Sequence, residues 1–178
     1  SHTPEEDPGT WKTVMTNIPL IMGVFPPNVM PEEIDNDHSQ RIRALIVSGS
    51  NVAFDLDRPS GPPQTDRDFL HFFLKARFAG DSTSERTVTG VPATVFRNVS
   101  LRFGLVSEGA PYSVSSPDYL LPEGGGSPIL TYGPVGTTVY AGVGYYGFFP
   151  AGLQPGAVAL LAFPFESVTT RDARDTLM

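Results

Sequence analysis

Hydrophobic and polar residues alternate along much of the chain, and this period of two predicts β-strands. The clearest case is RIRALIVSGSNVAFDLD, residues 41–57. A three-residue turn of Ser-Gly-Ser at 48–50 would place Ile46 opposite Val52 on a buried face. Because a slip of one residue would turn the apolar side chains to water, we expect a β-hairpin in this register.

Three later segments predict further strands. Residues 69–80, FLHFFLKARFAG, are apolar on both sides at their start, which is typical of an interior strand. Residues 95–107 alternate again, and the pattern predicts an inward-facing set of Val99, Leu101, Phe103 and Leu105. Residues 129–170 indicate a strand–turn–strand series interrupted by proline and glycine.

The 18 glycines and 18 prolines favour many turns and few long helices. Helix-start chemistry is found in residues 26–41, where a proline precedes two glutamates, and it predicts a single turn. We therefore expect an all-β fold, an antiparallel β-sandwich or barrel with long Pro/Gly-rich loops and at most one or two short helical turns. The loop at 108–128 has a length usual for functional or mobile loops.

The length of 178 residues suits a single β domain, which we expect to be excised from a larger protein. Residues 1–10 are expected to be a flexible leader and residues 171–178 a C-terminal tail. No cysteine is present, which excludes disulfides and zinc–thiolate sites. The net charge is −7 and only two lysines occur, so we expect no nucleic-acid binding. No run of 18 apolar residues occurs, and no membrane insertion is expected.

The segment GVGYYG, residues 142–147, has the glycine spacing of a dinucleotide-binding turn. That turn requires a helix directly after it, and the sequence Phe-Phe-Pro-Ala-Gly at 148–152 would break one. We therefore predict a strand here. Its glycines indicate that an aromatic ring of a neighbouring strand, or another subunit, approaches the backbone closely at Gly144.

Catalytic chemistry has few candidates. His38 lies in DNDHS and His71 in FLHFF, and no G-x-S-x-G motif is present. We expect no enzymatic activity and no cofactor; a hydrolase using His38 or His71 is the enzymatic alternative. No metal site is expected, and the candidates for metal ligands are Asp35, Asp37 and His38. Two acidic segments could supply such ligands: the first also contains Glu32 and Glu33, and the second contains Asp55, Asp57, Asp66 and Asp68.

Aromatic side chains that gather in the second half of the chain could stack on sugar rings. The candidate ligand-binding residues are Tyr112, Asp118, Tyr119, Tyr145 and Tyr146. Asn98 begins an Asn-Val-Ser triplet, which is a glycosylation acceptor in a secreted protein.

The closing run PAGLQPGAVALLAFPFESV, together with the acidic, cysteine-free, Pro/Gly-rich composition, resembles the protruding domains of small icosahedral positive-strand RNA virus capsids. Such domains occur in the nodavirus, astrovirus, hepevirus, tetravirus-like and Lake Sinai virus groups. The resemblance implies a non-enzymatic capsid projection on the virion surface, which forms dimers or trimers and attaches to a host-cell receptor or glycan. Iflavirus protruding domains carry an Asp-His-Ser group, which only DNDHS resembles.

Another class of function stays open. The same features fit a carbohydrate-binding or adhesin module of a secreted protein, which the flanking sequence would distinguish from a capsid projection. A signal peptide or a catalytic domain upstream would indicate the secreted module, whereas a basic arm and a jelly roll would indicate the capsid.

Overall fold

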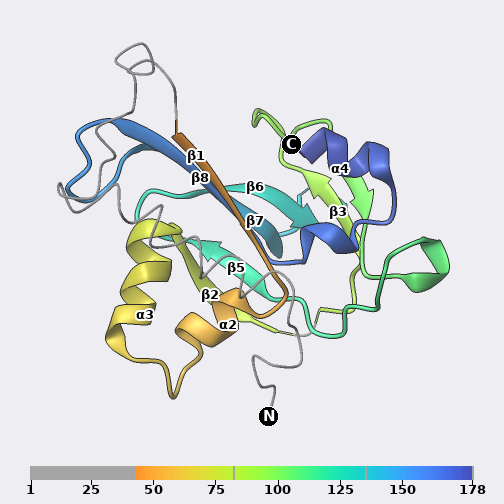
Figure 1. Cartoon of the computed structure of the whole chain (residues 1–178), viewed down its shortest axis with the longest axis horizontal. Coiled ribbons are helices and arrows are strands. Elements are labelled where there is room, and N and C mark those ends of the chain that lie inside the picture. The colour runs from red at the N-terminus through yellow and green to blue at the C-terminus, as the bar shows by residue number, and fades with distance from the viewer. Residues whose placement is uncertain (1–42, 82, 135, 178) are drawn as a thin grey trace, which may run out of the picture.

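The computed structural model describes residues 43–81, 83–134 and 136–177, and it shows a mostly-β fold in which one mixed sheet curls into a half-barrel (Figure 1). Its strands are β1 (Arg43–Ser48), β2 (Ala76–Gly80), β3 (Thr87–Gly90), β4 (Ser100–Arg102), β5 (Tyr119–Pro122), β6 (Ser127–Tyr132), β7 (Tyr140–Phe148) and β8 (Pro155–Leu161). The helical elements are α2 (Val52–Asp57), α3 (Gln64–Asp68), the π-helix η2 (Phe69–Phe73), the 3-10 turns η3 (Val106–Glu108) and η4 (Phe165–Ser167), and α4 (Arg171–Leu177).

The sheet runs in the order β1-β8-β7-β6-β3-β4, and β5 joins β7 to β2. The mostly-β character is confirmed. The expected antiparallel sheet is wrong in one place, because β1 and β8 are parallel. One curled sheet stands in place of a sandwich or closed barrel. The helical content also exceeds the expected one or two turns, since α2, α3 with η2, and α4 are all present in the described residues.

The predicted hairpin at 41–57 is wrong. Residues 52–57 form α2, and β1 pairs with β8 more than a hundred positions away. Val52, Ala53 and Leu56 are the buried apolar residues of α2, a spacing that fits a helix as well as the alternation fits a strand. In β1 the other side of the strand is buried. Ile46, expected on the buried face, is 42 % exposed, whereas its neighbour Val47 has no exposed surface.

The predicted strand at 69–80 is only half right. Its first half forms η2, and β2 begins only at Ala76. Between them Lys75 has a φ of 61°, a left-handed conformation that ends the helix and turns the chain into the strand. A continuous apolar run is compatible with both a buried helix and a buried strand, and tertiary packing chose the helix here.

The later strand predictions agree better with the structure. Val99, Leu101 and Phe103 are buried as expected, although β4 itself covers only Ser100–Arg102 and Leu105 is half-buried. The long loop at 108–128 contains β5. The strand–turn–strand series is confirmed as β6, β7 and β8. Residues 171–177, expected as a tail, form α4, and its Leu177 is buried in the core.

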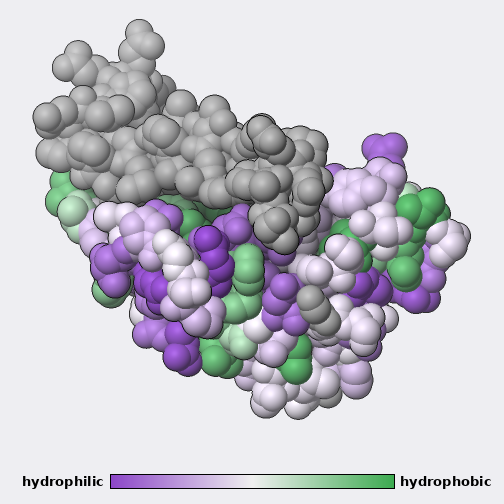
Figure 2. Space-filling model, turned by 90° about the horizontal axis from the view of Figure 1, so that it is seen from below, coloured by the Kyte–Doolittle hydropathy of each residue, from purple (hydrophilic) through white to green (hydrophobic). Residues whose placement is uncertain are grey.

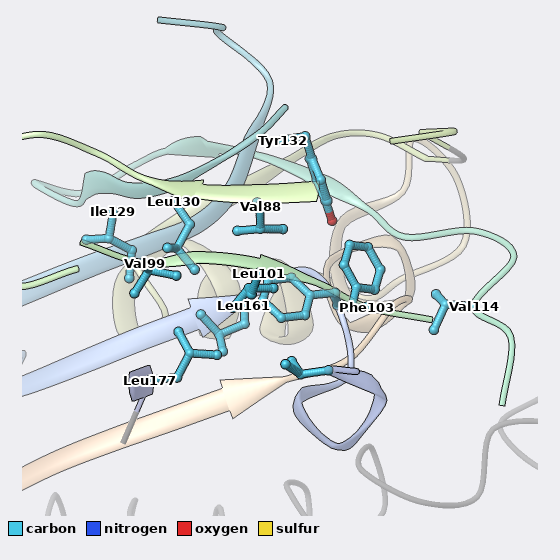
Figure 3. Packing of buried hydrophobic residues seen from close by; sticks show 13 residues of the cluster. Val88, Val99, Leu101, Phe103, Val114, Ile129, Leu130, Tyr132, Leu161 and Leu177 are labelled. Atoms are coloured by element: carbon cyan, nitrogen blue, oxygen red, sulfur yellow. The ribbon is translucent and has the colours of Figure 1, made fainter. Parts of the chain in front are cut away.

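Two hydrophobic cores lie against the curled sheet. The first, which we call core A, contains Phe103, Tyr132, Phe163 and Leu177, and it closes between β3, β4, β6 and the C-terminal helix (Figure 3). The rings of Phe103 and Phe163 stack with centroids 4.8 Å apart. The second, core B, is formed where α2 and η2 cover β1, β8 and β7, and it contains Leu56, Leu70, Val143 and Leu160. The strands β7 and β8 contribute to both cores.

Candidate functional site

The aromatic residues suggested by the sequence do not form one site. Tyr112 donates a hydrogen bond to Glu166 Oε1 at 2.6 Å and packs against core A. Tyr119 also packs against core A, with its ring directly over the backbone of Gly80. Tyr145 packs against core B, whereas its neighbour Tyr146 is 62 % exposed on the other side of β7. These four tyrosines therefore lie in different surroundings and do not share one binding surface.

Asp118 has no exposed surface, and this places it inside the fold. Its Oδ2 accepts the backbone N–H groups of Ala53 at 2.9 Å and Phe54 at 3.0 Å, which are orphan donors in the first turn of α2. Burial raises the pKa of Asp118 well above its ordinary value; these N–H groups oppose the shift, and the carboxylates of Asp81 and Asp55 add to it. The carboxyl group thus caps a helix that lies 64 residues earlier in the chain.

The exposed side of the sheet at β1, β8 and β7 is apolar. Residues that share this side are Ala44 and Ile46 on β1, Ala157 and Ala159 on β8, and Gly144, Tyr146 and Phe148 on β7. None of these seven residues is charged, and none of the residues paired with them across the strands is charged. The opposite side of the same strands belongs to core B. This part of the sheet is therefore apolar on both sides. One side is covered by α2 and η2; on the other side Gly144 and Ala159 contact core A, whereas Ala44, Ile46, Tyr146 and Phe148 are exposed.

Three large side chains dominate the exposed side: Ile46 at 42 %, Tyr146 at 62 % and Phe148 at 62 % exposure. We call Ile46, Tyr146 and Phe148 the hairpin face, because β7 and β8 form a hairpin whose tip carries Leu153, 95 % exposed. Elsewhere, exposed apolar residues are isolated. Seen from below, hydrophobic residues form small separate patches among hydrophilic ones (Figure 2). The other large exposed apolar side chains among the described residues are Phe72 on η2, Val95 in a connecting segment and Val106 on η3. Single exposed apolar residues are normal, whereas a contiguous group indicates an interaction surface.

Lys75 is a residue that the sequence did not single out. Its ammonium lies 4.4 Å from the ring centroid of Tyr145 and 5.6 Å from that of Phe149, so two aromatic faces hold the cation. Burial lowers the pKa of Lys75 below its ordinary value. A sequence signal existed, because Lys75 is one of only two lysines and lies in an otherwise apolar run. The contact joins the turn after η2 to the end of β7 next to the hairpin loop.

His71 makes an ion-pair contact rather than a catalytic triad. Its Nε2 lies 3.0 Å from Asp57 Oδ2, the oxygen that also accepts the backbone N–H of Phe78 at 3.1 Å. The other oxygen of Asp57 lies 3.6 Å from Nη1 of Arg67. Asp57 thus joins α2, the α3–η2 helix and β2 at one corner. In the described residues, the contacts of His71 include no hydroxyl group that could act as a nucleophile.

The GVGYYG segment lies within β7, as predicted. A Cβ added at Gly144 would lie 2.9 Å from Cγ2 of Ile129 on the neighbouring strand β6. The expected close approach to the backbone is confirmed, but the approaching side chain is aliphatic and not aromatic. A branched side chain reaches the backbone as closely as a ring does, so glycine is required on packing grounds alone.

The remaining candidates fall into two groups. Glu32, Glu33, Asp35, Asp37 and His38 lie outside the described residues, as do residues 1–10. Within the residues that the structure describes, no three or more histidine or acidic side chains are grouped so that they could hold a metal ion. In the same part of the chain, no helix has the length and apolar character needed to cross a membrane. Asn98 is exposed.

Comparisons of the chain with protein family models, with curated proteins and with solved structures find no match.

Proposed function

We propose that this domain is a non-enzymatic surface projection of a viral capsid, which associates with copies of itself on the particle and attaches to a host-cell receptor or glycan. The observation that carries the proposal is the hairpin face. A sheet region that is apolar on both sides needs a second cover, and a partner that docks on Ile46, Tyr146 and Phe148 would supply it.

A second copy of the chain is the partner that this surface suits best. The rungs of the exposed side carry alanine and glycine between the large residues, so the surface offers ridges and hollows of similar size. Such a surface can fit its own copy across a twofold axis, because each large side chain then meets a small one. Because the face carries no charge, two copies of a chain with net charge −7 would bring no like charges into direct contact there.

Attachment would use the part of the hairpin that the association face does not occupy. Leu153 lies in the loop between β7 and β8, with 95 % of its surface exposed. The site of attachment would therefore lie at the end of the domain formed by β7 and β8 (Figure 1).

Sedimentation velocity on the full chain tests the proposal. We expect the wild-type chain to sediment as a dimer or trimer, and the double variant Tyr146→Ser/Phe148→Ser to sediment as a monomer with at least a tenfold weaker association constant. The matched control is Val95→Ser/Val106→Ser, which removes two apolar side chains of similar exposure (86 % and 57 %) away from the hairpin face and should leave the association unchanged.

Two outcomes would contradict self-association. One is a wild-type chain that remains monomeric at all concentrations. The other is a monomer whose thermal midpoint falls in Tyr146→Ser, because the face would then be covered by the chain itself. Attachment is tested separately with the wild-type chain on a glycan array and on host cells; binding that persists in Leu153→Ser would place the attachment site elsewhere.

A further inference from the structure

Two aspartates follow the last pair of the β2–β5 ladder. These strands are antiparallel, and their last pair is Gly80 with Tyr119. Asp81 and Asp118 are the next residues of the two segments, and they are close enough for the charge of Asp81 to raise the pKa of Asp118. Like charges close to each other disfavour ionisation, so both carboxyl groups would not be expected to remain ionised without compensation.

The surroundings of the pair provide little compensation. Asp118 is completely buried, and one of its oxygens is occupied by the two N–H groups of α2. Its other oxygen, Oδ1, is buried and has no hydrogen-bond partner among the described residues. Oδ1 of Asp81 is likewise buried and has no hydrogen-bond partner among the described residues. Two buried acceptors without donors on neighbouring side chains are a costly arrangement, unless a proton lies between them.

Among the described residues, no cationic side chain is a hydrogen-bond partner of the Asp118 carboxyl group. On α2, the carboxylate of Asp55 adds a like charge, and it lies 3.6 Å from Arg58 Nη1. On β6, the hydroxyl of Tyr132 donates to the main-chain oxygen of Asp118 at 2.9 Å. The guanidinium of Arg86 acts on Tyr132, and its Nη2 donates to the carbonyl groups of Val114 at 2.7 Å and Ser115 at 3.3 Å.

We propose that Asp81 and Asp118 share one proton between their Oδ1 atoms, and that this acid–carboxylate bond fastens α2 to the end of the β2–β5 ladder. A single O–H···O⁻ bond gives a partner to both orphan oxygens and removes the repulsion between the two charges. It makes the corner of the fold formed by α2, β2 and β5 sensitive to pH. This device is independent of the function proposed above, because the pair is remote in sequence and in the sheet from the hairpin face.

The direction of the pH effect follows from the raised pKa of Asp118, which burial causes and Asp81 strengthens. In the folded chain the pair keeps its proton at pH values at which the unfolded chain has released it. The stabilisation is therefore complete at acidic pH, below the ordinary value of 3.8, and it declines as pH rises towards the raised pKa. This corner of the fold is therefore more stable at acidic pH than at alkaline pH.

Urea unfolding of the full chain between about pH 4 and pH 8 tests the proposal. We expect the unfolding equilibrium constant of the wild type to rise with pH, by up to about tenfold per pH unit within the titration window. Asp118→Asn and Asp81→Asn should each flatten this rise, because an amide donates to the remaining carboxylate without titrating. The matched control is Asp175→Asn, an exposed aspartate in a surface pair with Arg171, which should keep the wild-type slope.

Infrared spectroscopy of the wild type supplies a measurement that does not depend on whether a variant folds. We expect a protonated carboxylic acid band that persists at pH values above 3.8, the ordinary pKa of aspartate, and disappears on alkaline titration. Absence of that band overturns the proposal. So does a wild-type slope retained in Asp81→Asn, because Asp118 would then be protonated by burial alone. A thermal midpoint raised by calcium chloride in the wild type, but not in Asp118→Asn, would show that a cation occupies the pair instead.

Discussion

Single residues in this protein are constrained mainly by what reaches them from distant parts of the chain. Gly144 shows this well. It lies in a run of glycines and tyrosines whose spacing suggests a phosphate-binding turn, yet its environment is a strand with Ile129 of β6 against its α-carbon. The carbonyl oxygen of Val158 on β8 lies 3.5 Å from where a Cβ would be. The glycine is therefore held between two neighbouring strands.

This contact predicts the effect of enlarging Gly144. Gly144→Ala should lower the free energy of unfolding by about 1–3 kcal/mol, because Cγ2 of Ile129 is close to its own backbone and cannot swing away. A double-mutant cycle in urea checks the cause. In the background of Ile129→Ala the same glycine substitution should cost much less; an equal cost in both backgrounds would assign the strain to another contact.

At the scale of elements, the corner around Asp57 decides how the helices meet the sheet. The carboxylate is buried and contacts three separate elements through His71, Arg67 and the main chain of Phe78. Asp55 lies two positions earlier in α2 and makes a partly exposed pair with Arg58. Asp55 and Asp57 lie on the same helix, but Asp57 is buried and Asp55 is partly exposed.

We predict that the two aspartates differ in their importance for stability. Asp57→Ala should cost about 2–3 kcal/mol, because it leaves the partly buried backbone N–H of Phe78 and the side chains of Arg67 and His71 without this carboxylate. Asp55→Ala should cost less than about 1 kcal/mol, as is usual for a pair near the surface. Urea denaturation of both variants measures the difference, and equal costs would show that the corner does not depend on the buried carboxylate.

The same corner explains why the sequence predicted some elements and not others. In β7 and β8, alternation continues over many residues and only a strand fits it. In residues 52–57 the apolar positions fit both periods. The helix α2 is favoured over a strand by the cap from Asp118, which lies 65 positions away and so is invisible to a local sequence pattern. The parallel partner of β1 and the proximity of Asp81 to Asp118 are likewise products of topology, so the site residues could be named but not placed.

The whole molecule is organised around strands that are shared between two cores. On β8, the adjacent residues Leu161 and Leu160 point to opposite sides of the sheet and belong to core A and core B. On β7, Ala141 belongs to core A and Val143 to core B, and the register to β6 shifts around Ala141. The curled sheet has α2 and η2 on one side of these strands and β3 and β4 further along it (Figure 1). Loss of either core would therefore destabilise β7 and β8, which the other core also contains.

Sharing of strands predicts that the described part of the chain unfolds in one cooperative step. Leu101→Ala in core A and Leu70→Ala in core B remove equally large buried side chains, and each should cost about 2–5 kcal/mol. Both variants should shift the same single transition, whether it is followed by tyrosine absorbance or by far-ultraviolet circular dichroism. Two separate transitions, with each variant moving only one of them, would instead show that the cores are independent folding units and that β7 and β8 do not couple them.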